Sequence, residues 1–168
     1  MIEVRQLNLG DLEALVALRA EALANHPLAF GATSDEDRLL SSRGKEVVAD
    51  TSGQSVVFGG FEGEVLEGIV GLHQAAGGKR RHKGMVWGMY VRPSARRKGI
   101  GHALLEAAIG HARSWPDVRQ LQLSVTDAAG EARRLYLSAG FTEWGREPRS
   151  LSWQGQVTDE SHLVLILQ

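Results

Sequence analysis

Apolar residues recur along the chain with two different periods, and each period predicts one type of secondary structure. Short apolar or alternating runs, bounded by glycine, proline and acidic turns, predict strands. Seven such runs occur, at residues 2–5, 55–61, 65–74, 85–92, 119–125, 141–146 and 161–167. The second, third and fourth runs follow one another directly, so we expect them to form an antiparallel meander.

Apolar residues spaced by three and four positions predict four helices. The first begins at Asp11, which is placed to cap it, and the second begins at Ser34 with acidic residues in its first turn. The third is ended by Pro116. The fourth covers about residues 132–139, with Gly140 in the position of a left-handed C-terminal cap.

The order of these elements predicts a mixed α/β fold of the α+β class. A strand, a helix and a strand between residues 85 and 125 form a crossover unit, which makes its two strands parallel and is right-handed in nearly all proteins. The other strand neighbours are expected to be antiparallel, so the central sheet is mostly antiparallel with one parallel pair. With 168 residues and no linker or repeat, we expect a single domain over residues 1–168.

The composition is that of a folded, water-soluble protein, with 43% hydrophobic and 23% charged residues. The chain has no cysteine, which excludes a disulfide framework, a thiolate metal site and a cysteine nucleophile, and we expect no bound metal. The lack of cysteine is compatible with a reducing cytoplasm, the location we expect. The first five residues lack the apolar core of a signal peptide, and no apolar run approaches the roughly 20 residues of a membrane span.

Positive charge is concentrated in one stretch of the chain. The formal net charge is -1, yet eight of the 19 lysines and arginines lie between Lys79 and Lys98. No aspartate or glutamate occurs between Glu67 and Glu106. Such a cluster favours the binding of an anion, and a solvated basic surface is the simpler alternative.

The sequence Arg96-Arg97-Lys98-Gly99-Ile100-Gly101 lies between a predicted strand and a predicted helix. Glycines let a ligand approach the backbone, and the first N–H groups of a helix point outward at the positive end of its dipole. Three cations beside such donors suit a pyrophosphate, whereas a flexible turn is the alternative. The segment lacks the Gly-Lys-Ser/Thr ending of a Walker loop and the glycine spacing of a dinucleotide fingerprint.

Three stretches together resemble the GNAT superfamily of acyl-CoA-dependent N-acyltransferases. They are Met89-Tyr90-Val91-Arg92-Pro93, the loop from Arg96 to Gly101, which fits the family's Arg/Gln-x-x-Gly-x-Gly/Ala signature, and Leu135-Tyr136-Leu137-Ser138-Ala139-Gly140-Phe141. Their order and spacing match the family over about residues 55–145. The resemblance implies acetyl-CoA as the cofactor, in a cleft between two splayed parallel strands formed here by residues 85–92 and 119–125.

The resemblance also implies roles for individual residues. The backbone of Met89 and Val91 would hydrogen-bond the pantetheine arm and polarise the thioester carbonyl, and the amides from Arg97 to His102 would hold the pyrophosphate. The cofactor-binding residues expected are Met89, Tyr90, Val91, Arg96, Arg97, Lys98, Gly99, Ile100, Gly101 and His102. Tyr136 would be the general acid for the departing thiolate, because a phenol with a pKa near about 10 is protonated at neutral pH. A core tyrosine is the alternative, since Tyr136 lies on the apolar stripe of its helix.

The general base is the part of the reaction for which the sequence offers no clear residue. An attacking amine must lose a proton, but the strand at residues 85–91 contains no carboxylate. The remaining candidates are Glu160, His162 and His73, and residues of these types are more often structural or solvent-facing.

The acceptor pocket is expected between the first two helices and the late strands, with the loop His26–Gly31 as one wall. Ordinary packing is an equally good explanation of that apolar loop. Relatives often carry asparagine in the loop before the last helix, where this chain has Ala129, which puts one polar cofactor contact in question.

The leading hypothesis is therefore an N-acetyltransferase that moves an acetyl group from acetyl-CoA to a small-molecule or peptide amine by direct attack. A non-catalytic acyl-CoA-binding module is the alternative if the base is absent. Nucleic-acid binding through residues 79–83 and 96–98 is a third hypothesis, and the near-zero net charge weighs against it. The sequence identifies neither the acceptor amine nor the oligomeric state, for which a homodimer is one option.

Overall fold

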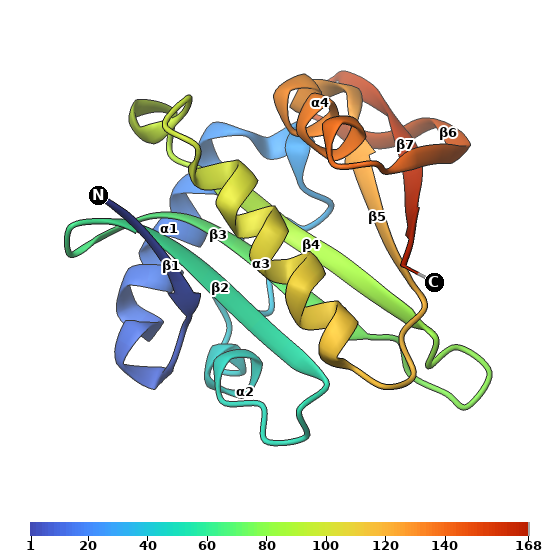
Figure 1. The fold of residues 1–168 in the computed structure, drawn as a ribbon. Helices are drawn as coiled ribbons and strands as arrows, with labels where there is room; N and C mark the ends of the chain where they lie inside the picture. Colours follow the sequence, from blue (N-terminus) through green and yellow to red (C-terminus); the bar gives the residue numbers. More distant parts are fainter. Residues whose placement is uncertain (168) are drawn as a thin grey trace.

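The computed structural model describes residues 1–167, which contain seven strands in one sheet. The strands are β1 (Ile2–Gln6), β2 (Ser55–Glu62), β3 (Val65–Gln74), β4 (Lys83–Val91), β5 (Gln120–Thr126), β6 (Thr142–Trp153) and β7 (Gln156–Ile166). Across the sheet they are ordered β1-β2-β3-β4-β5-β7-β6, and every neighbouring pair is antiparallel except β4 and β5 (Figure 1). The predicted mixed fold with one parallel pair is confirmed.

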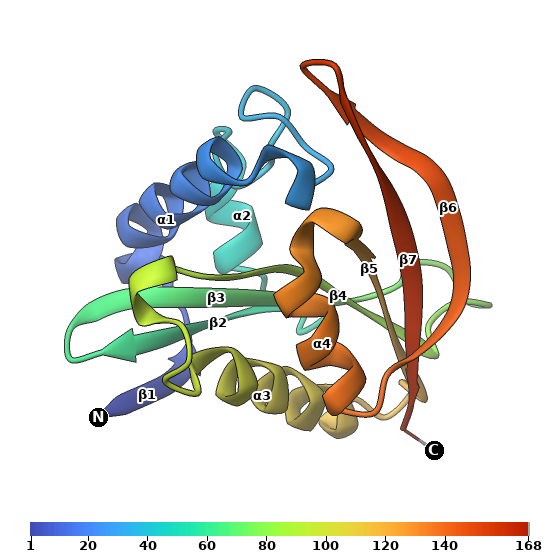
Figure 2. The ribbon, with the colours of Figure 1, turned by 90° about the horizontal axis from the view of Figure 1, so that it is seen from above.

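Helices cover both faces of the sheet. They are α1 (Leu12–Asn25), α2 (Gly44–Val48), α3 (Ile100–Ser114) and α4 (Gly130–Ser138), with short 3₁₀ turns at Leu9–Asp11, Pro27–Ala29, Pro93–Ala95 and Asp127–Ala129. Figure 2 shows α1 and α2 on one face and α3 on the other. None of the helices within residues 1–167 has the length and hydropathy to traverse a bilayer.

Alternation along β3 places its buried side chains in two separate hydrophobic cores. Val70 and Leu72 pack in the core that contains Leu104 of α3, and Ile69 packs in the core that contains Leu15 of α1. All five side chains are at most 1% exposed. The sheet is therefore buried on both faces at β3, and β4, next to β3, runs between the two layers of helices.

β4 and β5 separate soon after they begin. They pair only where Lys83 to Met85 face Gln120 to Gln122. Further along β4, two residues stand opposite the single residue between Ile69 and Gly71 of β3, and Gly88 adopts a φ of 67° at this bulge. In the described chain, the edge of β4 beyond Met85 therefore has no ladder partner in β5, which confirms the predicted splay.

The structure corrects how the first helix begins. Asp11 stands at the N-cap of α1 but makes no side-chain capping bond to that helix. Its carboxylate instead accepts hydrogen bonds from the Arg5 guanidinium, both at 2.8 Å, and from the amide of Asn8 at 2.9 Å. The prediction of a capping aspartate was wrong because a nearby arginine and the preceding turn take up the carboxylate.

No helix begins at Ser34, and residues 34–43 consist mostly of turns. Asp37, expected in the first helical turn, is buried and binds Arg19 through two hydrogen bonds of 2.8 and 3.0 Å. The helix begins only at Gly44, where an added Cβ would lie 2.4 Å from the carbonyl oxygen of Leu39. A tertiary ion pair thus replaces the local helix that the sequence pattern predicted.

The end of the chain agrees in type but not in length with the predicted strands. Gly140 follows α4 with a φ of 100°, as expected for a left-handed cap. β6 and β7 extend much further than predicted, as a hairpin closed by Gln154 and Gly155, both of positive φ. Most of β6 is exposed on both faces, so its sequence carries no alternating apolar signal.

Candidate functional site

A cleft of about 600 Å³ opens beside the part of β4 that no longer pairs with β5. Its walls come from the turn after α1, from β4, from the loop and first turn of α3, and from the beginning of α4. The lining residues are His26, Ala29, Phe30, Met89, Tyr90, Val91, Arg96, Arg97, Gly99, Ile100, Gly101, His102, Ala128, Ala129, Gly130, Glu131, Ala132, Arg134 and Leu135. The structure thus brings together nine of the ten predicted cofactor-binding residues, and leaves out Lys98.

The loop before α3 has the backbone form of an anion-binding nest. Arg97 and Gly99 both adopt positive φ, 62° and 87°, and Gly99 forms the N-cap of α3 without a side-chain capping bond. The first N–H groups of a helix have no partner within the helix, and alternating left- and right-handed residues aim such groups at one point. An anion at this place would meet several backbone donors and the positive end of the helix dipole.

The three cations of the loop have different environments. Arg96 donates from Nε to the Val91 carbonyl oxygen at 2.9 Å and from Nη1 to Glu131 at 3.4 Å. Lys98 binds Glu62 at 2.7 Å, away from the cleft. Within residues 1–167, the Arg97 side chain makes no hydrogen bond or ion pair, so it is the cation of this loop that is available to an anion.

These residues fit the pyrophosphate of acetyl-CoA. Besides the N–H donors and the unpaired Arg97, the loop presents Gly101, where an added Cβ would lie 3.3 Å from Leu135 and 3.6 Å from Val91. A larger side chain at residue 101 would therefore crowd the cleft wall. The loop keeps its backbone accessible at the position where the predicted phosphate would approach.

A partly buried network supports the α1 side of the cleft. The Tyr90 hydroxyl donates to Glu21 of α1 at 3.2 Å, and burial followed by the Glu21 charge raises the pKa of that phenol. Arg92 binds the same glutamate at 3.1 Å and binds Glu67 of β3 at 3.0 Å. These contacts tie the end of β4 to α1 and hold the Tyr90 ring in place.

His26 is a cleft residue whose chemical potential the sequence did not reveal. Its ring packs against Tyr90 with 5.6 Å between ring centres, and its Nε2 is buried without a hydrogen-bond partner among the described residues. Burial, and then the charge of Arg96, lowers the pKa of His26 below its usual 6.5. The turn after it is fixed at Leu28, whose carbonyl oxygen accepts from Thr126 of β5 at 2.7 Å.

Tyr136, the predicted general acid, does not line the cleft. Its side chain is 5% exposed and its ring lies edge-on to Phe141, with 5.9 Å between centres. Burial raises the pKa of its phenol, so the group stays protonated at neutral pH. The neighbouring Leu135 does line the cleft, and the catalytic role of Tyr136 stays a prediction.

None of the three base candidates lines the cleft. Glu160 and His162 form a cluster with Glu147 on the β6–β7 hairpin, with their ligand atoms within 4.8 Å of one another. His162 also shares a 2.7 Å hydrogen bond with Ser124. Neither residue lines the cleft, and the third candidate, His73, lies in a different cavity.

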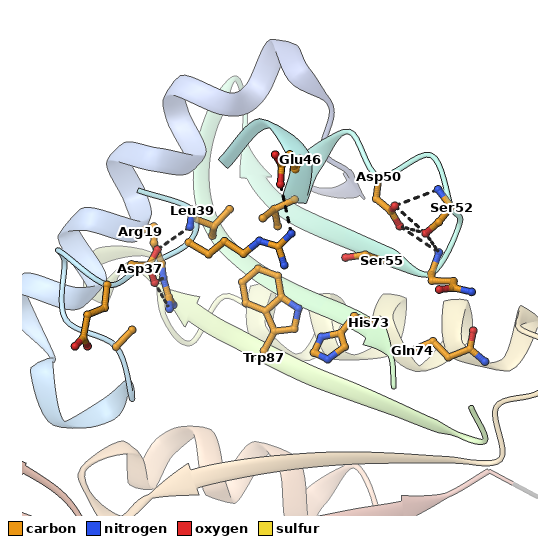
Figure 3. Close-up of a pocket in the computed structure, with 15 residues that line it drawn as sticks. Arg19, Asp37, Leu39, Glu46, Asp50, Ser52, Ser55, His73, Gln74 and Trp87 are labelled. Carbon is orange, nitrogen blue, oxygen red and sulfur yellow. Dashed lines mark hydrogen bonds and ion pairs between the residues drawn. The ribbon is translucent and has the colours of Figure 1, made fainter. Parts of the chain in front are cut away.

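This second cavity, of about 570 Å³, lies between the α2 region and strands β3 and β4 (Figure 3). Its lining residues are Arg19, Ala32, Glu36, Asp37, Arg38, Leu39, Glu46, Val47, Asp50, Ser52, Gln54, Ser55, His73, Gln74 and Trp87. Trp87 lies over Gly71 of β3, where an added Cβ would be 2.0 Å from the indole. Burial, and then the charge of Arg38, lowers the pKa of His73.

Comparison with known sequences and structures agrees with the geometry of the cleft. Residues 16–141 match the sequence model of the acetyltransferase (GNAT) family. A mycothiol acetyltransferase of Thermobispora bispora is 37% identical over 139 residues, which are 80% of this chain and 44% of that protein. The chain thus spans less than half the length of that curated relative.

Solved structures share the fold over nearly the whole chain. An acetyltransferase of the GNAT family from Streptococcus pneumoniae has a TM-score of 0.85 at 24% identity and covers 99% of both chains. A putative acetyltransferase from Salmonella typhimurium, solved with its cofactor acetyl-CoA, also has a TM-score of 0.85, at 22% identity over 100% of this chain and 95% of the other.

Proposed function

The chain belongs to the acetyltransferase (GNAT) family, and on that premise we propose that it transfers the acetyl group of acetyl-CoA to an amine of a small molecule or peptide. The observation that carries this proposal is the cleft at the start of α3, where uncapped helical N–H groups, two positive-φ residues and the unpaired Arg97 converge. The solved relative from Salmonella typhimurium, which contains acetyl-CoA, supports the cofactor. The Thermobispora relative is named for mycothiol, and the acceptor of the present chain is open.

In this proposal the loop at residues 96–102 holds the pyrophosphate through backbone N–H groups, and Arg97 adds a cation. Arg96 is tied to Val91 and Glu131, so it acts chiefly by fixing the loop against β4 and α4. The backbone of Met89 and Val91, on the unpaired edge of β4, would receive the pantetheine arm and the acyl carbonyl. Ala129 also lines the cleft and offers only its backbone there.

When bound, acetyl-CoA supplies an acetyl thioester, and the net reaction forms one N–C bond, breaks one C–S bond and releases one proton. An aliphatic amine has a pKa near about 10 and is mostly protonated at neutral pH, so it must give up a proton before it attacks. His26 is the cleft residue suited to accept this proton. Its lowered pKa keeps the imidazole neutral, and its Nε2 has no partner among residues 1–167. Tyr136 holds a proton on its phenol oxygen.

The decisive experiment separates cofactor binding from turnover. Binding of CoA should raise the melting temperature with concentration, as expected for a ligand that stabilises by RT ln(1 + [L]/Kd). Release of free CoA from acetyl-CoA is then measured over a panel of amines, for the wild type and for Tyr136→Phe. We expect turnover with at least one amine and a kcat about 100-fold lower for the variant, with CoA affinity unchanged.

If CoA leaves the melting temperature unchanged, the proposed function fails at its first step. If CoA binds but no amine is acetylated, the chain is the non-catalytic acyl-CoA-binding module that the sequence left open. A cytoplasmic location and a homodimeric state stay predictions.

A further inference from the structure

Two buried polar side-chain atoms of residues 1–167 have no hydrogen-bond partner, and both belong to the surroundings of Phe30. They are Nη1 of Arg19 and Nε2 of His26. The guanidinium carbon of Arg19 lies 4.8 Å from the centre of the Phe30 ring. His26 and Phe30 both pack against Tyr90, at 5.6 and 6.4 Å between ring centres. Folded proteins leave few such atoms unsatisfied, so we take both as candidate contacts for a ligand.

The unsatisfied atom of Arg19 is a hydrogen-bond donor. The other two nitrogens of its guanidinium already bind one oxygen of Asp37, at 3.0 and 2.8 Å. The second oxygen of Asp37 accepts the amides of Leu39 and Leu40, at 3.0 and 3.2 Å. Asp37 therefore has no free oxygen for Nη1, and the Arg19 side chain is only 8% exposed. An acceptor oxygen from outside the chain would complete the set.

Arg19 lines the second cavity and contacts a residue of the cleft. That residue is Phe30, on which Arg19 stacks. Nη1 is also the nearest atom to a Cβ built on Gly88, at 3.7 Å. Gly88 is the bulge residue of β4, between Trp87 in the cavity and Met89 in the cleft. A group bound to Nη1 would thus be next to the strand that is expected to receive the acyl carbonyl.

The unsatisfied atom of His26 is suited to a hydrogen-bond donor. Burial keeps this imidazole neutral, and a neutral imidazole has one nitrogen that accepts a hydrogen bond. With the proton on Nδ1, the buried Nε2 is that acceptor, and an amine N–H satisfies it. The two orphan atoms together call for an oxygen acceptor at Arg19 and a nitrogen donor at His26.

Among the charged residues that line the second cavity, Arg19 is the one best suited to bind an anion. Glu36, Glu46 and Asp50 line the cavity and repel anions. Arg38, the other arginine of the lining, is 62% exposed and pairs with Glu46 at 3.7 Å. Figure 3 shows Arg19 and Asp37 at one end of the cavity and Asp50 and Ser52 at the other, with Trp87 and His73 between them.

We propose that the second cavity is the acceptor site and that the acceptor is a small amine which also carries a carboxylate. The carboxylate binds Nη1 of Arg19, the amine meets Nε2 of His26 beside the cleft, and the rest of the molecule occupies the polar cavity. The assignment rests on the acetyl transfer proposed above. It names a substrate class, an amino acid or a close analogue, for a reaction whose acceptor was open.

The first test uses the wild-type protein and matched acceptors. Each amino acid of a panel of 20 is compared with its decarboxylated amine and its carboxamide, by CoA release and by mass of the acetylated product. We expect kcat/KM for the preferred amino acid to exceed that of its decarboxylated partner at least tenfold. Equal rates for the two would overturn the assignment, whatever the behaviour of any variant.

The second test measures binding without acetyl-CoA, by ligand-observed NMR with the same amino acids. Arg19→Lys keeps the charge beside Asp37 but loses the forked donor, and we expect at least tenfold weaker amino-acid binding with unchanged CoA affinity. Arg43→Lys is the matched control, because Arg43 is exposed, pairs with Glu46 at 3.1 Å and lines neither cavity. An equal loss in the two variants, or no binding of any panel member, would refute the proposal.

His26→Gln supplies a readout that a purely structural role would not change. In the wild type, protonation of His26 should lower the acetylation rate at acid pH. The variant should lose this decrease, and its rate should instead rise with pH as the acceptor amine loses its proton. If amino acids bind through Arg19 while no acetylation occurs, the carboxylate site stands and the acetyl-transfer function fails. The two hypotheses therefore fail on different measurements.

Discussion

The cleft and the second cavity both border β4 but are built in opposite ways. The cleft depends on the backbone of one continuous segment, residues 96–102, with a positive φ at Gly99 and the start of α3. The cavity depends on side chains from α1, from residues 32–55 and from two strands, and the ion pair at one end of it joins Arg19 to Asp37 across 18 positions. A backbone site needs particular residue types at a fixed local spacing, whereas a side-chain site needs only that the fold bring distant residues together.

The largest effect that this difference predicts is on stability, at the cavity. Asp37→Ala removes the partner of a buried arginine and two amide acceptor bonds, and should lower the free energy of unfolding by about 3–5 kcal/mol. Urea denaturation measures it. Asp117→Ala is the control, because Asp117 pairs with Arg81 at the surface and should cost less than about 1 kcal/mol. Similar losses in the two variants would show that the Arg19 pair is not buried in solution.

A substitution in the cleft should have the opposite effect: it should weaken CoA binding and leave the protein folded. Gly101→Val places a branched side chain against Leu135 and Val91 and should weaken CoA binding about 100-fold, or about 2.8 kcal/mol. Gly110→Val, later in α3, meets nothing within 4 Å and should leave affinity unchanged. Titration calorimetry of the two variants checks the difference. Retained affinity in Gly101→Val would remove residue 101 from the phosphate site.

The same contrast explains what the sequence alone predicted. The phosphate loop, the crossover around it and the cap at Gly140 were predicted because each depends on local spacing, period or glycine geometry. Arg19 was missed because a charged residue in an amphipathic helix is normally assigned to the solvent face. Only the tertiary partner, Asp37, makes its burial possible, and that same pairing replaced the helix predicted at Ser34.

Residues with no local signal account for the remaining differences. His26 reads in sequence as part of an apolar loop, and its unpaired Nε2 is visible only after Tyr90 packs on it. Most of the β6–β7 extension is exposed on both faces, so no period marks it. Tyr136 keeps both of its interpretations, since its burial suits a core residue and its raised pKa suits a proton donor.

A smaller effect, on pH dependence, involves both regions. Burial lowers the pKa of His26 in the cleft and of His73 in the cavity. Near and below pH 6.5 the unfolded chain therefore binds more protons than the folded one, and the stabilisation present above pH 6.5 is lost as pH falls toward the lowered values. The melting temperature should therefore fall between pH 7.5 and pH 5. It should fall less steeply with pH in His73→Gln than in the wild type. An identical slope in that variant would contradict the burial of His73.

The smallest effects concern the basic cluster, where neighbouring cations should behave differently. Arg97 lines the cleft with no partner among residues 1–167, so Arg97→Ala should weaken CoA binding about tenfold, as expected for a charge-assisted hydrogen bond. Lys98 points its ammonium at Glu62, 2.7 Å away and outside the cleft, so Lys98→Ala should change the affinity less than about threefold. Raising the salt concentration should reduce the Arg97 effect and leave the Lys98 effect near zero, because only the former charge acts on the ligand. Equal losses for the two substitutions would mean that these cations act as a diffuse field, and not through the one cation of residues 96–98 that has no partner in the described part of the chain.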